Sequence, residues 1–187
     1  GNTPCVEIAV NGHLIIIDAG TGIIGLGQKL MARSAQGRNG QSSDPLVIML
    51  LFSHTHHDHT QGFPFFLPAY RGSNSIYIFG PRILSEDLAE ALNRSMVSPS
   101  FPVELSEMQA RPIIRNIEES EALLLCQPSK IPAVRNIHHH QLECGPETVL
   151  VRLYKSYAHP KGGTIIYRIE WNGKSVVYAS DTEGYDG

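Results

Sequence analysis

The segment SHTHHDHTQG, residues 53–62, follows directly on the apolar run LVIMLLF, residues 46–52. A run that is apolar at every position predicts a central strand covered on both faces. Four of the nine histidines of the chain lie within residues 54–59, with an aspartate among them. A solvated polar turn needs neither a buried strand before it nor an interleaved carboxylate. The pattern therefore favours a metal site at the end of this strand.

The spacing within this segment predicts which side chains converge. In an extended chain alternate side chains share a side, so His54, His56 and Asp58 are expected to face one way and His57 the other. A helix that begins near His59 would bring its ring beside Asp58. Imidazole and carboxylate donors suit Zn²⁺, and also iron or manganese. Because neighbouring ligands cannot all reach one ion, two ions fit this set better than one.

The rest of the chain shows a pattern of short strands and few helices. Asn11-Gly12 and Asn172-Gly173 each separate β-branched runs and predict tight hairpins. Residues 103–144 give no clear period. Helices are predicted over residues 23–33 and 83–96, and strands over residues 5–10, 13–18, 46–52, 75–79, 148–155, 164–170 and 175–180. This pattern indicates a layered α/β or α+β domain.

Length and composition exclude several classes of protein. The 187 residues suggest one domain, and 42% apolar with 18% charged residues predicts a packed core rather than disorder. A net charge of −3 indicates no strongly basic face. No apolar run reaches membrane-spanning length and no cleavable signal pattern opens the chain. Three cysteines without a C-x-x-C pair fit a reducing compartment, so we expect a cytoplasmic protein with no membrane partner.

SHTHHDHTQG resembles the HxHxDH signature of the metallo-β-lactamase-fold hydrolases. The similarity extends to GNTPCVEI and LIIIDAGTG near the start, residues 1–8 and 14–22, and to HPKGGTIIYRIEWNGKSVVYASDTE, residues 159–183. The branch most similar to this sequence is the ribonuclease Z-like phosphodiesterase group. The resemblance implies an α/β fold, the four-layer αβ/βα metallo-β-lactamase sandwich, with residues 1–187 forming a single domain.

The resemblance also implies metal ligands, residue by residue. His54, His56 and His159 would bind a first divalent ion. Asp58 and His59 would bind a second. The expected ions are two Zn²⁺, with Mn²⁺ or Fe²⁺ as alternatives.

Asp181 would bridge the two ions, and Asp58 would also be the catalytic residue that orients the attacking water or takes its proton. In this family a further histidine, well downstream of the bridging aspartate, completes the second metal site. No histidine follows His159 in this sequence. The abrupt start and end of the sequence and this missing ligand suggest a fragment that lacks the C-terminal part of the domain.

The implied function is that of a dinuclear metal-dependent hydrolase that uses a metal-bridging hydroxide. A small-molecule or nucleotide phosphodiester is the expected substrate, with RNA as a further candidate despite the weak basic character, and a homodimer is a further expectation. Fold and ligand set do not decide the substrate. A hydrolase of thioesters, lactones or β-lactams, and a non-catalytic or single-metal-binding member of the fold, stay open as alternatives.

Other residues are weighed for chemistry and set aside. Asp18, at a strand end, is expected from the resemblance to support the ligand loop by hydrogen bonding rather than to bind metal. Ser53 is not in a G-x-S-x-G motif, and no cysteine has a nucleophile's setting, so covalent catalysis is not predicted. Residues 138–140, three consecutive histidines, are interpreted as a solvated loop.

Overall fold

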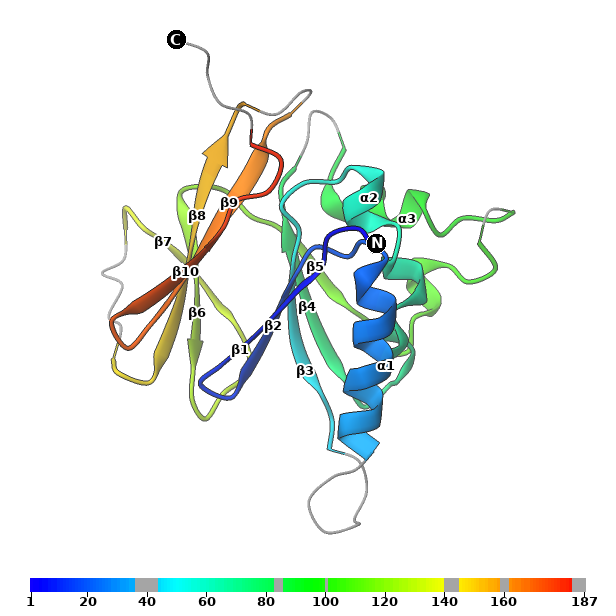
Figure 1. The fold of residues 1–187 in the computed structure, drawn as a ribbon, viewed down its shortest axis with the longest axis horizontal. Helices are drawn as coiled ribbons and strands as arrows, with labels where there is room; N and C mark the ends of the chain where they lie inside the picture. The colour runs from blue at the N-terminus through cyan, green and yellow to red at the C-terminus, as the bar shows by residue number, and fades with distance from the viewer. Residues whose placement is uncertain (36–43, 83–85, 100, 140–144, 159–161, 183–187) are drawn as a thin grey trace.

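The computed structural model describes residues 1–35, 44–82, 86–99, 101–139, 145–158 and 162–182. Within these ranges the chain forms two five-stranded sheets that face each other, with the helices packed on the outer side of the first sheet (Figure 1). The expected α/β fold with two stacked sheets is confirmed. None of the helices in these ranges has the length and apolar character needed to cross a bilayer.

The first sheet is mostly parallel. Its strands follow chain order: β1 (Val6–Val10), β2 (His13–Ile17), β3 (Val47–Leu51), β4 (Ser75–Gly80) and β5 (Ile113–Asn116). Only the β1–β2 pair is antiparallel, so the carboxyl ends of β2, β3, β4 and β5 lie along one edge of the sheet. Loops at that edge are where an open α/β sheet places its functional groups.

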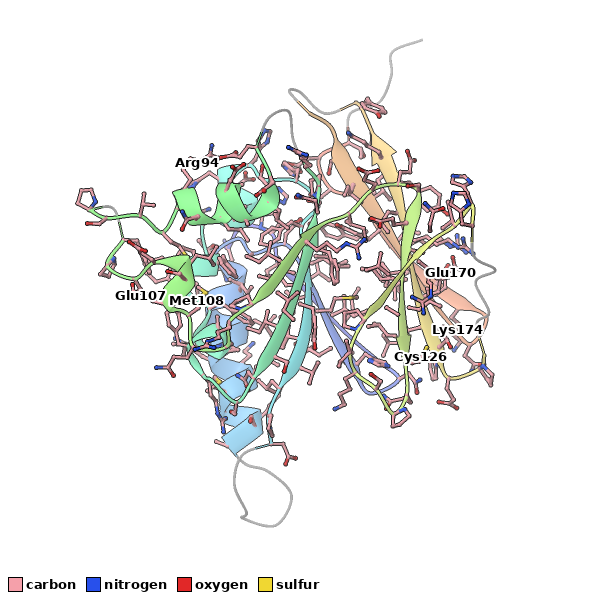
Figure 2. All side chains as sticks on the ribbon, turned by 180° about the vertical axis from the view of Figure 1, so that it is seen from behind. Arg94, Glu107, Met108, Cys126, Glu170 and Lys174 are labelled. Carbon is pink, nitrogen blue, oxygen red and sulfur yellow. The ribbon has the colours of Figure 1, made fainter. Side chains whose placement is uncertain are left out.

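The second sheet is antiparallel throughout. Its spatial order is β10 (Lys174–Tyr178), β9 (Thr164–Trp171), β8 (Thr148–Ser156), β6 (Glu121–Cys126) and β7 (Ala133–Asn136). Glu170, on β9, lies on the side of this sheet that faces away from the first (Figure 2). Alternation of apolar and polar residues along β8 and β9 fits a sheet with one covered face.

The helices are short apart from the first. They are α1 (Gly22–Ala35), α2 (His57–Thr60) and α3 (Leu88–Arg94), with the 3₁₀ helices η1 (Phe63–Phe65), η2 (Leu67–Tyr70) and η3 (Leu105–Glu107). The predicted helix over residues 83–96 is shorter than expected, because the Asp87 side chain caps Glu90 N and starts α3 at Leu88. Residues 83–85 lie outside the described ranges.

The core is divided by the first sheet into two layers, and β2 shows how. Ile15 and Ile17 pack between the two sheets, whereas Ile16 packs against the helices, and all three are fully buried. β3 is buried on both faces in the same way, as its uniformly apolar sequence predicts.

Both predicted hairpins are confirmed. Asn11 and Gly12 have φ angles of 45° and 73°, and Asn172 and Gly173 have 48° and 72°. Two successive positive φ angles define the tight turn that the Asn-Gly dipeptide favours.

Candidate metal centre

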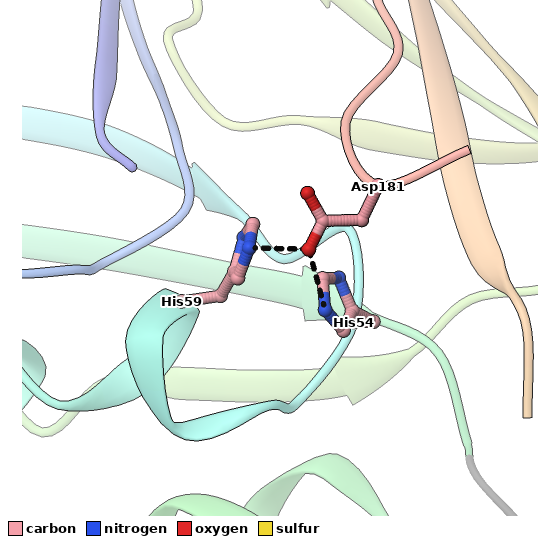
Figure 3. A group of neighbouring side chains, drawn as sticks. All are labelled: His54, His59 and Asp181. Atoms are coloured by element: carbon pink, nitrogen blue, oxygen red, sulfur yellow. Dashed lines mark hydrogen bonds and ion pairs between the residues drawn. The ribbon is translucent and has the colours of Figure 1, made fainter. Parts of the chain in front are cut away.

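Three chain segments bring polar side chains to the carboxyl edge of the first sheet (Figure 3). β3 ends at Leu51, and the chain continues without regular structure through His54 before α2 begins at His57. α2 then turns His59 back toward His54. Asp181 arrives from the second sheet, after the end of β10. The site is therefore built between the two sheets.

His54, His59 and Asp181 form the cluster at the centre of this edge. Asp181 Oδ2 lies 3.1 Å from His59 Nε2 and 3.6 Å from His54 Nε2. The three donor atoms all lie within 4.8 Å of one another. Both imidazoles are buried, whereas the Asp181 side chain is 37% exposed. Two imidazole nitrogens and a carboxylate oxygen facing one point are a donor set that fits Zn²⁺, Mn²⁺ or Fe²⁺, and three protein ligands leave room for water.

The fully buried carboxylate of Asp18 orients the two histidine rings, His59 directly and His54 through Ser53. Asp18 Oδ2 accepts hydrogen bonds from His59 Nδ1 at 2.8 Å, Ser53 Oγ at 2.8 Å and Tyr178 OH at 2.7 Å. Asp18 Oδ1 accepts from Ser53 N at 2.8 Å. Ser53 Oγ also lies 3.0 Å from His54 Nδ1. With both Nδ1 atoms engaged on this side, the Nε2 atoms of the two rings are left facing Asp181.

The electrostatics of the cluster favour positive charge between the carboxylates. Burial alone lowers the pKa of His59, but the hydrogen bond to Asp18 and the charges of Asp18, Asp58 and Asp181 outweigh it and raise that pKa. Partial burial raises the pKa of Asp181, but a hydrogen bond from Ser180 and the nearby histidines lower it overall. A site that stabilises a proton between carboxylates also stabilises a divalent cation in the same field.

The remaining residues of the motif lie around this cluster. Asp58 Oδ2 is 3.4 Å from His59 Nε2, and its side chain is 52% exposed. The ring of His56 is exposed and packs edge-on against His54, with ring centroids 4.6 Å apart. His57 is exposed on α2. Since α2 begins at His57, Asp58 reaches the site from the first helical turn rather than by strand alternation. His159 lies outside the described residues.

A family model for the beta-lactamase superfamily domain matches residues 13–187. The chain belongs to the metallo-β-lactamase superfamily. Most members of this superfamily are metal-dependent hydrolases. The resemblance carried by the HxHxDH segment is thereby confirmed at the level of the family.

Two curated relatives are similar to this superfamily member. Ribonuclease Z of Pyrococcus horikoshii is 25% identical over 209 residues, across 99% of this chain and 64% of that protein. Ribonuclease Z of Pyrococcus abyssi is 29% identical over 114 residues, across 59% of this chain and 34% of that protein. The chain thus spans less than two thirds of the length of either relative.

A solved structure shares the fold of this metallo-β-lactamase domain. The crystal structure of unliganded yeast PDE1 matches 94% of this chain and 59% of its own, with a TM-score of 0.51 and 11% sequence identity. At that identity the likeness shows a common architecture.

The DAGTG segment, residues 18–22, follows β2 and contacts α2 through its backbone. Ala19 N donates to His59 O at 2.7 Å, and Gly62 N donates to Ala19 O at 2.8 Å. A Cβ atom at Gly20 would collide with the backbone oxygens of Asp58 and Pro4. A glycine is therefore needed at position 20, because α2 packs directly on its backbone.

Two supporting residues of the domain were missed by sequence reasoning. Ser53 bridges Asp18 and His54, and its only sequence signal was its place just before the first histidine. Tyr178, 160 residues further along the chain, donates a hydrogen bond to Asp18, and the sequence of β10 gives no sign of this contact. Burial, followed by the charge of Asp18, raises the pKa of Tyr178, so its hydroxyl stays a donor. The expected supporting role of Asp18 matches its four hydrogen bonds.

Proposed function

We propose that the chain forms the catalytic core of a metal-dependent hydrolase of phosphodiester bonds. The observation that carries the proposal is the convergence of His54 Nε2, His59 Nε2 and Asp181 Oδ2 within 4.8 Å at the edge between the sheets. Membership of the metallo-β-lactamase superfamily supports hydrolysis. The similarity to two proteins named ribonuclease Z supports a phosphodiester as the bond that is cleaved.

The proposed ligand set is larger than the cluster of three. His56 and Asp58 lie beside His54 and His59 and would complete it together with His159. Two ions shared across Asp181, as the family resemblance implies, would use all six residues. A divalent ion bound here would polarise the phosphoryl group and lower the pKa of a water molecule, which supplies a nucleophile at neutral pH.

The protein side chains have separate tasks in this proposal. Asp18 and Ser53 fix the orientation of the two buried rings, so that their Nε2 atoms need no rearrangement when a metal ion binds. Asp58, half exposed at the mouth of the site, would orient the attacking water and accept its proton. Asp181, whose side chain is 37% exposed, would contribute its carboxylate to the ions from the solvent side of the two buried rings.

Metal analysis and a substrate panel test this proposal together. Metal content of untagged protein is measured by inductively coupled plasma mass spectrometry, and hydrolysis of bis-p-nitrophenyl phosphate is compared with that of a thioester and a lactone. We expect bound divalent metal and a preference for the phosphodiester. Preference for the thioester or lactone would overturn the substrate class, and metal without any hydrolysis would support the non-catalytic alternative.

Two histidine variants provide a matched pair. His54→Ala removes a buried donor of the cluster, whereas His57→Ala removes an exposed neighbour on α2. We expect His54→Ala to lose metal and activity and His57→Ala to keep both. Equal loss of metal from the two variants would contradict the assignment of the ligands.

A further inference from the structure

A cleft with a volume of about 470 Å³ lies between the end of β4, the connection from β5 to β6, the end of β8 and the start of β9. Its floor is apolar, because Ile117, Leu153 and Ile165 are each at most 5% exposed. Ile165 N donates to Ser53 O at 2.8 Å, and Ser53 directly precedes His54. The floor of the cleft is therefore one hydrogen bond away from the segment that carries the metal ligands.

The rim of this cleft exposes aromatic surface. Tyr157 is 71% exposed and Tyr154 is 45% exposed, although both are large side chains. Lys155 Nζ lies 5.0 Å from the centre of the Tyr157 ring, a cation–π contact that favours one orientation of the ring. An exposed ring at the edge of an apolar floor is a surface on which a flat heterocycle can stack.

The rim also carries charge. Arg82 and Lys155 line the cleft, and within the described ranges neither forms an ion pair with a carboxylate. Glu118 and Glu119 line the same cleft, and Glu119 Oε1 accepts a hydrogen bond from Lys155 N at 3.1 Å. Because two carboxylates balance the two cations, the cleft should attract inorganic phosphate only weakly. A ligand that carries both a phosphate and an aromatic base could contact the cations and the tyrosine rings together.

We propose that this cleft binds the nucleoside that flanks the scissile phosphodiester, with the base stacked on Tyr157 and the adjacent, non-scissile phosphate beside Lys155 and Arg82. The inference rests on the proposed function and narrows its substrate class to nucleotide diesters. The volume suits one nucleotide, since small-molecule sites begin at about 300 Å³. The hydrogen bond from Ile165 N to Ser53 O joins the floor of this cleft to the residue that precedes His54, which supports a nucleoside on this side of the proposed metal centre.

Two substrates with the same leaving group isolate the contribution of the nucleoside to kcat/KM. Thymidine 5′-(p-nitrophenyl phosphate) and methyl p-nitrophenyl phosphate both release p-nitrophenol, so the ratio of their kcat/KM values reports recognition of the nucleoside. Tyr157→Ala is expected to lower this ratio about tenfold, because stacking on one aromatic side chain contributes about that much. Tyr157→Phe keeps the ring and should keep the ratio.

A lysine pair tests the phosphate contact. Lys155→Ala should weaken binding of adenosine 5′-monophosphate in calorimetric titration, whereas Lys174→Ala, at the start of the edge strand β10 and outside the lining of the cleft, should not. An unchanged substrate ratio in Tyr157→Ala, or equal loss for both diesters, would overturn the proposal. If the wild-type protein cleaves neither diester, the proposed function fails by itself. Binding of adenosine 5′-monophosphate to metal-free protein, and its loss in Tyr157→Ala, then decides the inference separately.

Discussion

Asp18 offers the sharpest test of how the metal centre is held together. The change Asp18→Asn keeps the size and shape of the side chain, and asparagine tolerates the positive φ of 60° found at this position. The substitution therefore alters only charge and hydrogen-bonding capacity. Both carboxylate oxygens are used as acceptors, by Ser53, His59 and Tyr178.

The expected losses of stability and metal affinity in Asp18→Asn follow from this arrangement. An amide has one oxygen, so its NH₂ group must face either Ser53 N or the three donors on the other side. In a fully buried position at least one hydrogen bond to a charged acceptor is lost and the others weaken. Since each such bond is worth about 1.5–3 kcal/mol, we expect the free energy of unfolding to fall by about 3 kcal/mol. If His59 binds metal as proposed, loss of the partner that orients its ring should lower metal affinity about 10- to 100-fold.

The measurements are urea denaturation of metal-free protein and a Zn²⁺ titration against a competing chelator. Tyr167→Phe is the matched control, because Tyr167 OH donates to Phe52 O at 2.7 Å in an equally buried setting and makes no hydrogen bond to Asp18. That change should lower stability by about 1 kcal/mol and leave metal affinity unaltered. Unchanged Zn²⁺ affinity in Asp18→Asn, or an equal drop in Tyr167→Phe, would refute the reasoning.

Three further outcomes are expected. Gly20→Ala should lower the free energy of unfolding by about 2 kcal/mol, because its Cβ meets backbone atoms, whereas Gly25→Ala, in open space on α1, should raise it by about 0.5 kcal/mol in the same denaturation assay. Burial and two nearby carboxylates raise the pKa of the Cys5 thiol to about 12, so the thiolate is scarce at pH 8. Peptide mass spectrometry should find iodoacetamide on exposed Cys126 long before Cys5, with Cys5 labelling rising only toward pH 12. Zn²⁺ affinity of His57→Ala should equal that of wild type in the chelator titration, since His57 lies exposed on α2 outside the donor cluster.

Local signals predicted the elements whose conformation depends on neighbouring residues. Asn-Gly dipeptides adopt positive φ angles readily, so the sequence alone predicts both hairpins. Burial on both faces made β3 recognisable from its composition. β5, β6 and β7 lie in residues 103–144, where no period was found. β6 pairs with β8, which follows it by more than 20 residues, so the partner that stabilises it leaves no mark on its own sequence.

The candidate metal centre, too, was predicted only in part from the sequence. The HxHxDH segment and its place after a buried strand came from the sequence alone, and they sufficed to predict a metal site and the family. The start of α2 at His57 was not predicted, because the helix is held by backbone contacts with the glycine turn at Gly20 rather than by its own four residues. The structure brings His54, His59 and Asp181 together, and the metal-ligand roles of these three residues and of His56, Asp58 and His159 stay predictions.

What the sequence by itself determined is the set of candidate metal donors after β3 and the two Asn-Gly hairpin turns, because both depend on residues only a few positions apart. Tertiary structure alone decided that Asp181 lies 3.1 Å from His59 Nε2 across 122 residues of chain, and that Tyr178 closes the hydrogen bonds on Asp18. Those contacts exist because the apolar faces of the two sheets are buried against each other, which brings the end of β10 to the carboxyl edge of β2 and β3.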